Sequence, residues 1–349
     1  MKAYLILEDG TVFEGKAFGA DKTAVGELVF TTGMCGYIET LTDESYFGQI
    51  VLQTFPLIGN YGIIEEDFEG DCSVKAYAVQ EVCDNPSNFR MQKTLDAFLK
   101  EKGIPGICGI DTRAVTKRIR EKGVMNAAVA DEVPDSLDFI KNYKIVKAVE
   151  SVTVKEPRVY NENGKYSVVL IDYGAKRNII RELVKRDCRV TLVPASASAE
   201  EILSLKPGGI MLSNGPGDPA ENVYEINEIK KLTGTVPIFG ICLGHQLLAI
   251  SLGARTEKLK YGHRGVNQPV KETDGKRTYI TSQNHGYAVV SDSIKSGKIS
   301  FINANDGTCE GIDYPEINAF SVQFHPEACS GPRDTAFLFD RFIGLMEEK

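Results

Sequence analysis

The sequence contains no tryptophan, and only four histidines and eight cysteines among its 349 residues. Eight cysteines are too sparse for a disulfide scaffold in a chain of this length, and none forms a C-x-x-C pair, which argues against a zinc ribbon. We therefore expect most of the thiols to be reduced core residues. All four histidines lie in the C-terminal half, so imidazole chemistry is expected there.

Excess positive charge and long apolar runs are also lacking. The chain has 40 lysines and arginines against 48 aspartates and glutamates, a net charge of −8. Without a basic cluster, such a chain is a poor candidate for binding nucleic acid or an anionic membrane face. No apolar run approaches the ~18 residues of a membrane span, and Glu8 and Asp9 come before a signal-peptide core could form. We expect a cytoplasmic protein with no nucleic-acid or membrane partner.

What is present is an ordinary globular composition, 42% hydrophobic and 25% charged. Residues 1–150 contain short extended runs separated by glycine turns, which predicts a separate β-rich mixed domain. Residues 151–165 are polar and contain Pro157, which indicates a linker. From residue 166 to residue 349, apolar strands alternate with amphipathic helices. This pattern predicts an α/β domain with a doubly wound, mostly parallel sheet, whose ligands bind at the carboxyl ends of the strands.

Several elements are predicted from periodicity and from helix start and stop residues. In the first domain we expect helices over 91–102 and 112–121. In the second we expect strands over 166–172, 189–193, 209–213, 236–241 and 319–324, and helices over 177–186, 199–205, 221–232 and 243–252.

One cysteine stands at the junction of a predicted strand and helix. Cys242 directly follows the strand that ends at Ile241, and Gly240 and Gly244 flank it two residues away on either side. This spacing is typical of a nucleophile elbow. A thiol at a helix N-terminus is favoured as the thiolate, and the amide of Leu243 can donate to an oxyanion. The alternative is a buried structural cysteine.

Two further segments carry chemistry if they lie near this elbow. His325-Pro326-Glu327 follows a predicted strand, and the pair suits a base and the carboxylate that orients it. The loop 213–219 contains Gly215 and Gly217 and follows another strand, so its backbone amides are exposed at a strand end. No G-K-[ST] follows, which argues against a phosphate loop. Taken alone, each segment is equally a rigid turn.

Together these segments resemble the three signatures of the class I, triad-type glutamine amidotransferases, and this resemblance spans residues 166–349. In that family a Cys-His-Glu triad releases ammonia from glutamine through a glutamyl thioester. Other segments resemble the small subunits of carbamoyl-phosphate synthase, and with them the resemblance covers nearly the whole chain. These segments are 32–37, 43–46, 59–62, 107–120, 172–178 and 283–287.

The resemblance implies a glutaminase subunit in which Cys242 is the nucleophile, His325 the base and Glu327 its partner. It implies that L-glutamine is held by Ser45, Gly215, Gly217, Leu243, Gln246, Asn284, Gly286 and Tyr287. The implied partner is the large synthetase subunit, in a heterodimer or a higher oligomer, which receives ammonia through a tunnel. We expect no cofactor or metal in this chain, with ATP and a divalent metal only on the large subunit. The product would serve arginine synthesis, pyrimidine synthesis or both.

Two other interpretations stay open at this point. The glutaminase component of anthranilate or GMP synthesis shares the triad domain but would lack residues 1–150. A non-catalytic regulatory module would keep the triad only as packing. The sequence also departs from the family pattern at Cys35, where a small polar residue is usual, and at Cys329, where serine is common. His245 and His285 are interpreted as packing or hydrogen-bonding residues.

Overall fold

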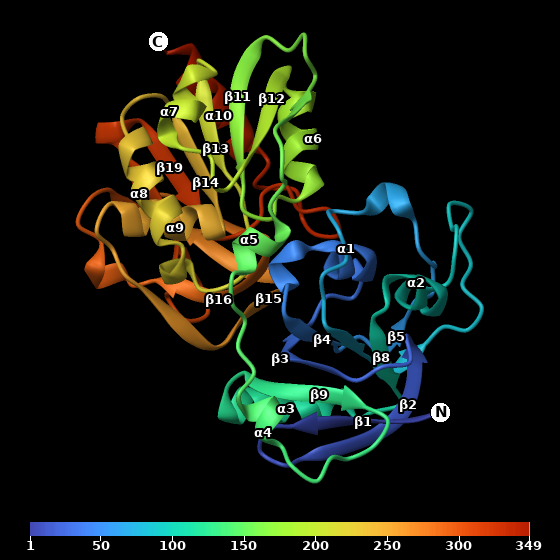
Figure 1. Ribbon diagram of the computed structural model, residues 1–349. Coiled ribbons are helices and arrows are strands. Elements are labelled where there is room, and N and C mark those ends of the chain that lie inside the picture. The colour runs from blue at the N-terminus through green and yellow to red at the C-terminus, as the bar shows by residue number, and fades with distance from the viewer. Residues whose placement is uncertain (349) are drawn as a thin grey trace. The chain divides into compact units, whose positions relative to one another are not determined.

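The computed structural model describes residues 1–348, which divide into two compact units, Met1–Val146 and the residues from Lys147 onward. Each unit is described by itself (Figure 1). Among the described residues, no helix combines the length and the apolar character that crossing a membrane requires.

The first unit is built on a closed barrel in the strand order β1-β2-β8-β6-β4-β3-β9. The strands are β1 (Lys2–Leu7), β2 (Val12–Gly19), β3 (Ala24–Thr31), β4 (Gln49–Gln53), β6 (Ala76–Ala78), β8 (Pro105–Cys108) and β9 (Met125–Ala130). β4 pairs in parallel with β3 and β6, and β6 with β8, whereas the remaining pairs are antiparallel. The predicted β-rich mixed domain is therefore confirmed.

Strand alternation in β1 separates two hydrophobic clusters of this unit. Leu5 and Leu7 belong to a buried cluster with residues of β3, β4 and β9, and the helix α3 (Thr112–Lys122) adds Val115 to it. Ile6, which points to the opposite face, packs with Ile140 of the short helix α4 (Asp138–Lys141). One strand thus contributes to a core on each of its faces.

Most of the remaining elements of the first unit contribute to another buried cluster that includes Tyr37 and Phe98, and η2 (Glu65–Asp67) follows Ile64 of this cluster. The contributing elements are α1 (Tyr37–Thr42), η1 (Glu44–Tyr46), β5 (Leu57–Ile58), β7 (Glu81–Val82) and α2 (Leu95–Lys102). The start predicted for the last helix, residue 91, is wrong by four residues. The helix begins after Thr94, whose side chain accepts a hydrogen bond from the amide of Ala97 at 3.2 Å and so caps it.

The second unit contains one mixed sheet in the order β10-β12-β11-β13-β14-β19-β18-β17-β15-β16. Its parallel part consists of β12 (Cys188–Pro194), β11 (Tyr166–Asp172), β13 (Gly209–Leu212), β14 (Ile238–Ile241) and β19 (Ala319–Val322). β10 (Arg158–Tyr160) pairs antiparallel with β12, so part of the segment expected as a linker belongs to this sheet.

Helices cover both faces of the parallel part, as the doubly wound prediction requires (Figure 1). Val169 and Ile171 of β11 pack in one cluster, whose helices are α5 (Ala148–Val152), α7 (Ala199–Ser204), α8 (Val223–Leu232) and α9 (Leu243–Ser251). Val168 and Leu170 pack in a second cluster, whose helices are α6 (Arg177–Lys185) and α10 (Phe337–Glu347). The predicted fold class is confirmed.

The other part of this sheet is antiparallel and was not predicted as separate strands. It consists of β18 (Cys309–Tyr314), β17 (Lys298–Asn303), β15 (Thr256–Glu272) and β16 (Thr278–Val289). The long ribbon of β15 and β16 is irregular, with register shifts between Lys258 and His263 and between Gly265 and Gln268. Short 3-10 turns complete the unit: η3 (Pro219–Glu221), η4 (Ser291–Ser293) and η5 (Pro315–Ile317).

Candidate active site

Cys242 lies on a sharp turn between β14 and α9, as the sequence predicts. Its backbone has φ 52° and ψ −102°, a positive φ that non-glycine residues rarely adopt. Its amide donates to the carbonyl of Val322 at 2.8 Å, and its carbonyl accepts from the amide of Gln246 at 3.2 Å. The junction is therefore held from the neighbouring strand and from the first turn of the helix. The side chain is only 2% exposed.

The two flanking glycines are required by close backbone approach rather than by positive φ. A Cβ on Gly240 would lie 2.8 Å from the carbonyl oxygen of Gly244, and a Cβ on Gly244 would overlap the carbonyl oxygen of Leu212. The amide of Gly244 also donates to Ser213 at 2.9 Å. The start of α9 thus packs directly on the end of β13, which larger residues would prevent.

His325 and Glu327 form a buried pair just beyond β19. Nδ1 of His325 lies 2.7 Å from Oε1 of Glu327, and the two residues are 1% and 4% exposed. Because Nδ1 faces a carboxylate it carries a proton, which leaves Nε2 of the neutral ring as an acceptor. Nε2 is buried and has no hydrogen-bond partner among the described residues.

The strand pairing brings Cys242 and His325 to one edge of the sheet. β14 and β19 are parallel neighbours, with Ile241 opposite Val322, so both residues follow the carboxyl ends of adjacent strands. Both also contact β16: the thiol of Cys242 lies 3.7 Å from the carbonyl oxygen of Asn284, and the amide of His325 donates to Ser282 at 2.9 Å. Two residues of one strand therefore anchor the cysteine and the histidine.

Lys176 is a charged residue of this region to which the sequence analysis gave no role. Its Nζ lies 4.0 Å from Oε1 of Glu327, and its side chain is only 12% exposed. Burial alone would raise the pKa of Glu327, but the neighbouring His325 and Lys176 hold it below its usual value. The backbone of Lys176 donates to the side chain of Asn214 at 3.0 Å. The sequence did contain an indication that Lys176 is important, because it lies in the segment 172–178, which contributes to the family resemblance.

The glycine-containing loop that follows β13 lies against the elbow. A Cβ on Gly215 would overlap the carbonyl oxygen of Tyr173 and would lie 2.8 Å from the side chain of Leu243. Gly217 has a φ of 91° and packs closely on Ala148. Backbone groups of this loop therefore come close to the start of α9, which is what the sequence analysis expects of residues that bind glutamine.

Residues of β16 and α9 form a second side of the site. Nε2 of Gln246 donates to the carbonyl of Tyr287 and to Oε1 of Gln323, both at 2.8 Å. Nζ of Lys258 lies 6.0 Å from the ring centroid of Tyr287, and a Cβ on Gly286 would lie 3.2 Å from the guanidinium of Arg264. Gln246 thus links the helix of Cys242 to the segment 284–287.

The other residues singled out in the sequence are described by their surroundings within their own unit. Ser45 lies in η1 of the first unit, where its amide donates to Asp43 at 3.0 Å, and its contact with glutamine stays a prediction. Cys35 is exposed, and Cys329 is partly buried beside Arg333. His245 is buried with Nδ1 2.8 Å from the hydroxyl of Ser321, and burial lowers its pKa to about 3. These surroundings favour a packing role for His245.

Comparisons with known proteins agree along the whole chain. The family model "Glutamine amidotransferase class-I" matches residues 169–345, and the model "Carbamoyl-phosphate synthase small chain, CPSase domain" matches residues 5–129. The carbamoyl phosphate synthase small chain of Oceanobacillus iheyensis is 51% identical, over 99% of this chain and 96% of its own length. That of Clostridium perfringens is 50% identical, over 98% of this chain and 99% of its own length. The chain belongs to the family of carbamoyl phosphate synthase small chains.

Proposed function

We propose that this chain is the glutaminase subunit of a glutamine-dependent carbamoyl phosphate synthase. The observation that carries the proposal is the pairing of a strained, buried cysteine at a strand–helix junction with a histidine–glutamate pair after the adjacent parallel strand. Strained residues with buried polar partners are characteristic of active sites. The family membership supplies the substrate class, because it joins a glutamine amidotransferase domain to a carbamoyl phosphate synthase small-chain domain.

In the proposed reaction, the sulfur of Cys242 attacks the side-chain carbonyl carbon of glutamine while Nε2 of His325 takes the thiol proton. Backbone amides near Leu243 and Gly215 stabilise the oxyanion. The C–N bond then breaks, and His325 returns the proton to the leaving ammonia, which leaves a glutamyl thioester on Cys242. His325 next removes a proton from water, which attacks the thioester and releases glutamate and the free thiol.

Glu327 and Lys176 have supporting roles in this proposal. Glu327 holds Nδ1–H of His325 and stabilises the imidazolium that forms in each step. Lys176 favours the ionised form of Glu327, and its charge is effective because the group it faces is buried. The proposed glutamine contacts are those expected from the sequence: Ser45, Gly215, Gly217, Leu243, Gln246, Asn284, Gly286 and Tyr287.

The proposal includes a partner. The relatives are named small chains, which implies a large chain. We assign the steps that consume ATP, together with their divalent metal, to a large synthetase subunit that receives ammonia from this chain in a heterodimer or a higher oligomer in the cytoplasm. Ammonia released into bulk water would be diluted and protonated. Direct delivery to the partner would keep it available for carbamoyl phosphate synthesis.

The two other interpretations are less favoured. A glutaminase component of anthranilate or GMP synthesis does not account for residues 5–129, which match the small-chain domain. A regulatory module with a relic triad does not account for the positive φ of Cys242, because backbone strain persists only where the surrounding structure maintains it.

The decisive experiment reconstitutes the chain with its large subunit and compares synthesis from glutamine with synthesis from ammonium. Cys242→Ser and His325→Asn are expected to abolish the first and to spare the second. An electrophilic glutamine analogue is expected to label Cys242, as located by peptide mapping. Glutamine-dependent synthesis that survives Cys242→Ser, or labelling that persists unchanged in that variant, would remove the nucleophile assignment. Loss of both syntheses would indicate a folding or assembly defect and would overturn the assigned role.

A further inference from the structure

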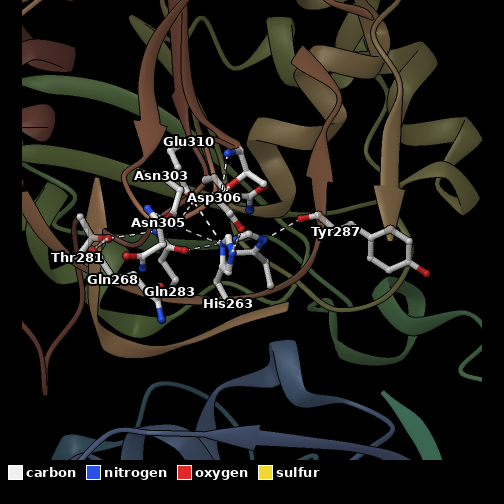
Figure 2. A network of polar contacts seen from close by, with 12 residues as sticks. His263, Gln268, Thr281, Gln283, Tyr287, Asn303, Asn305, Asp306 and Glu310 are labelled. Atoms are coloured by element: carbon white, nitrogen blue, oxygen red, sulfur yellow. Dashed lines mark hydrogen bonds and ion pairs between the residues drawn. The ribbon is translucent and has the colours of Figure 1, made fainter. Parts of the chain in front are cut away.

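A buried polar cluster lies between the antiparallel strands of the second unit, and the proposed reaction does not use it (Figure 2). It contains His263 of β15, His285 of β16, Glu310 of β18, and Asp306 from the turn between β17 and β18. Glu310 is fully buried, and His285 and His263 are 5% and 9% exposed. Burying so many titratable groups is unfavourable unless their partners are well placed, so the cluster calls for a physical reason.

Each ring nitrogen of His263 faces a carboxylate. Nε2 lies 2.8 Å from Oδ2 of Asp306, and Nδ1 lies 3.5 Å from Oε1 of Glu310. Burial opposes charge on the ring, but Glu310 and Asp306 outweigh it and raise the pKa of His263. Asn303 also donates to Oε1 of Glu310, at 3.1 Å. Burial raises the pKa of Glu310, and the hydrogen bonds and charge that His263 and Asn303 bring oppose that shift. The geometry is that of an imidazolium placed between two carboxyl groups, one of them fully buried.

His285 connects this ion pair to the candidate active site. It lies opposite His263 in the strand register, and the two rings meet edge to face with centroids 4.9 Å apart. Nδ1 of His285 donates to the carbonyl of Tyr287 at 2.8 Å, the same carbonyl that accepts from Gln246. The neighbouring Asn284 contacts the thiol of Cys242 through its carbonyl. The segment 284–287 is therefore held from α9 on one side and from the buried cluster on the other.

A backbone link reinforces this connection. The amide of Gln323 donates to the carbonyl of Glu310 at 2.9 Å, and Oε1 of Gln323 accepts from Gln246 at 2.8 Å. A displacement of Glu310 would thus also shift α9 through Gln323 and Gln246, which is a second route between the cluster and the site. Both routes end on groups that position the proposed glutamine-binding segment, and the first meets the sulfur of Cys242 only through the backbone carbonyl of Asn284.

We propose that His263, Asp306 and Glu310 form a positioning network that acts through His285 to hold residues 284–287 in the conformation that binds glutamine. The proposal rests on the proposed glutaminase function. It predicts a role in substrate affinity rather than in bond breaking, because His285 and the backbone of Asn284 stand between the ion pair of His263 and the sulfur of Cys242. Buried networks of hydrogen bonds and ion pairs favour one conformation over its neighbours, and a network that loses one charge leaves the opposite charge uncompensated.

The test uses the complex with the large subunit. His263→Gln keeps a polar side chain of similar size but cannot bridge two carboxylates as a cation. We expect the KM for glutamine to rise by ~10-fold, a change worth about 1.4 kcal/mol. We expect kcat at saturating glutamine and ammonium-dependent synthesis to remain near the parental values. Asp274→Asn, which removes an exposed ion pair with Lys298 on the same sheet, is the matched control and should leave the KM unchanged.

A second variant separates charge balance from shape. Combining His263→Gln with Glu310→Gln removes the cation and the buried anion together, so no uncompensated charge remains. We expect this double variant to recover most of the loss in KM. A role confined to stability would lower the midpoint of thermal unfolding without changing the ratio of KM to kcat.

Three results would overturn the proposal. The first is a parental KM in a folded His263→Gln complex, and the second is a double variant as impaired as the single one. The third is zinc or another transition metal bound in stoichiometric amount and lost in His263→Gln, which would make the cluster a metal site. Failure of the proposed function is distinguishable from all three, because it would appear as glutamine-dependent synthesis that persists in Cys242→Ser.

Discussion

Cys242 combines three properties that a single residue seldom has: a positive φ, near-complete burial, and a place at the first turn of a helix. The turn exists because small residues surround it and because Val322 and Gln246 hold its backbone on both sides. The reactivity of the sulfur therefore depends on the backbone geometry that its neighbours maintain, and substitutions of the glycines that pack around the turn should act through the position of Cys242.

The first such substitution is Gly244→Ala. Its Cβ would overlap the carbonyl oxygen of Leu212, so the start of α9 must shift. A shift of about 1 Å can cost ~100-fold in rate, and overpacking costs about 1–3 kcal/mol in the free energy of unfolding. We expect both losses, measured as glutamine-dependent turnover and by urea unfolding, with ammonium-dependent synthesis preserved. Gly344→Ala, where a Cβ meets open space within a helix, is the control. Equal behaviour of the two variants would contradict the packing argument.

A second residue-scale prediction concerns charge and compares Lys176→Gln with Lys176→Arg. Removing the charge removes an interaction that lowers the pKa of Glu327, so that pKa rises and Glu327 binds a proton at a higher pH than before. The acid limb of the pH profile of kcat/KM for glutamine should move to higher pH in Lys176→Gln, whereas Lys176→Arg should keep the parental limb. Superimposable acid limbs in the parent and both variants would show that the charge of the Lys176 side chain does not affect the pKa of Glu327.

The residues that carry the proposed chemistry were accessible from sequence, and their supports were not. Cys242 and His325 stand in short, well-spaced segments whose chemistry can be read locally. Lys176 looks like any surface lysine until the loop after β11 brings it to Glu327. The contact of His263 with Glu310 was inaccessible, because it depends on irregular strand register between segments far apart in the chain.

Among the elements, helix ends show how a single side chain sets a boundary. Asp111 accepts from the amide of Ala114 at 2.9 Å and starts α3 where the sequence predicts. The equivalent cap of α2 is Thr94, three residues beyond the start that the sequence predicts. Apolar periodicity continues through Met91, but residues 91–94 are not helical, and Lys93 forms a bridge with Ile63 instead. The tertiary contact overrides the local pattern there.

This cap provides an element-scale prediction. Thr94→Ala removes the acceptor for the amide of Ala97 and is expected to lower the free energy of unfolding by about 1 kcal/mol. Thr94→Ser keeps the hydroxyl and should stay close to the parent. The measurement is urea unfolding of the chain followed by circular dichroism. An alanine variant as stable as the serine variant would mean that the first turn of α2 is held by packing rather than by its cap.

The sheet of the second unit contains strands that the sequence predicts and strands that it does not. Its parallel strands are apolar runs that alternate with helices, so their type follows from the sequence, whereas their order in the sheet was not predicted. The antiparallel strands β15 and β16 alternate charged, polar and glycine residues, and their pairing contains register shifts. No simple period describes such strands. Yet β16 contacts both Cys242 and His325, so the least predictable element is the one that both groups share.

At the scale of the whole molecule, buried histidine makes stability depend on pH. His245 has a pKa of about 3 in the folded state because burial disfavours its charged form. In the unfolded chain its pKa returns to about 6.5, so between these values the unfolded state binds the additional proton. The titration of His245 therefore leaves the free energy of unfolding unchanged well above pH 6.5 and lowers it as the pH falls toward 3.

His245→Gln tests this linkage. From pH 6.5 to pH 5 the parental chain should lose about 2 kcal/mol through this one group, and the variant should lose that much less. The measurement is the free energy of unfolding at a series of pH values, with the slope rather than the absolute stability as the readout. Parallel curves for parent and variant would show that His245 binds protons equally well in both states.

The burial of Cys242 has a practical consequence for anyone who titrates the sulfhydryl groups of this protein. Cys35 is exposed, whereas Cys242, the proposed nucleophile, is enclosed, so a mild alkylating reagent is expected to modify Cys35 first. One equivalent of reagent consumed without loss of activity would be the normal result and no sign of an inert enzyme. Inactivators should therefore be evaluated in a Cys35→Ser background, in which this exposed thiol no longer competes for the first equivalent of reagent.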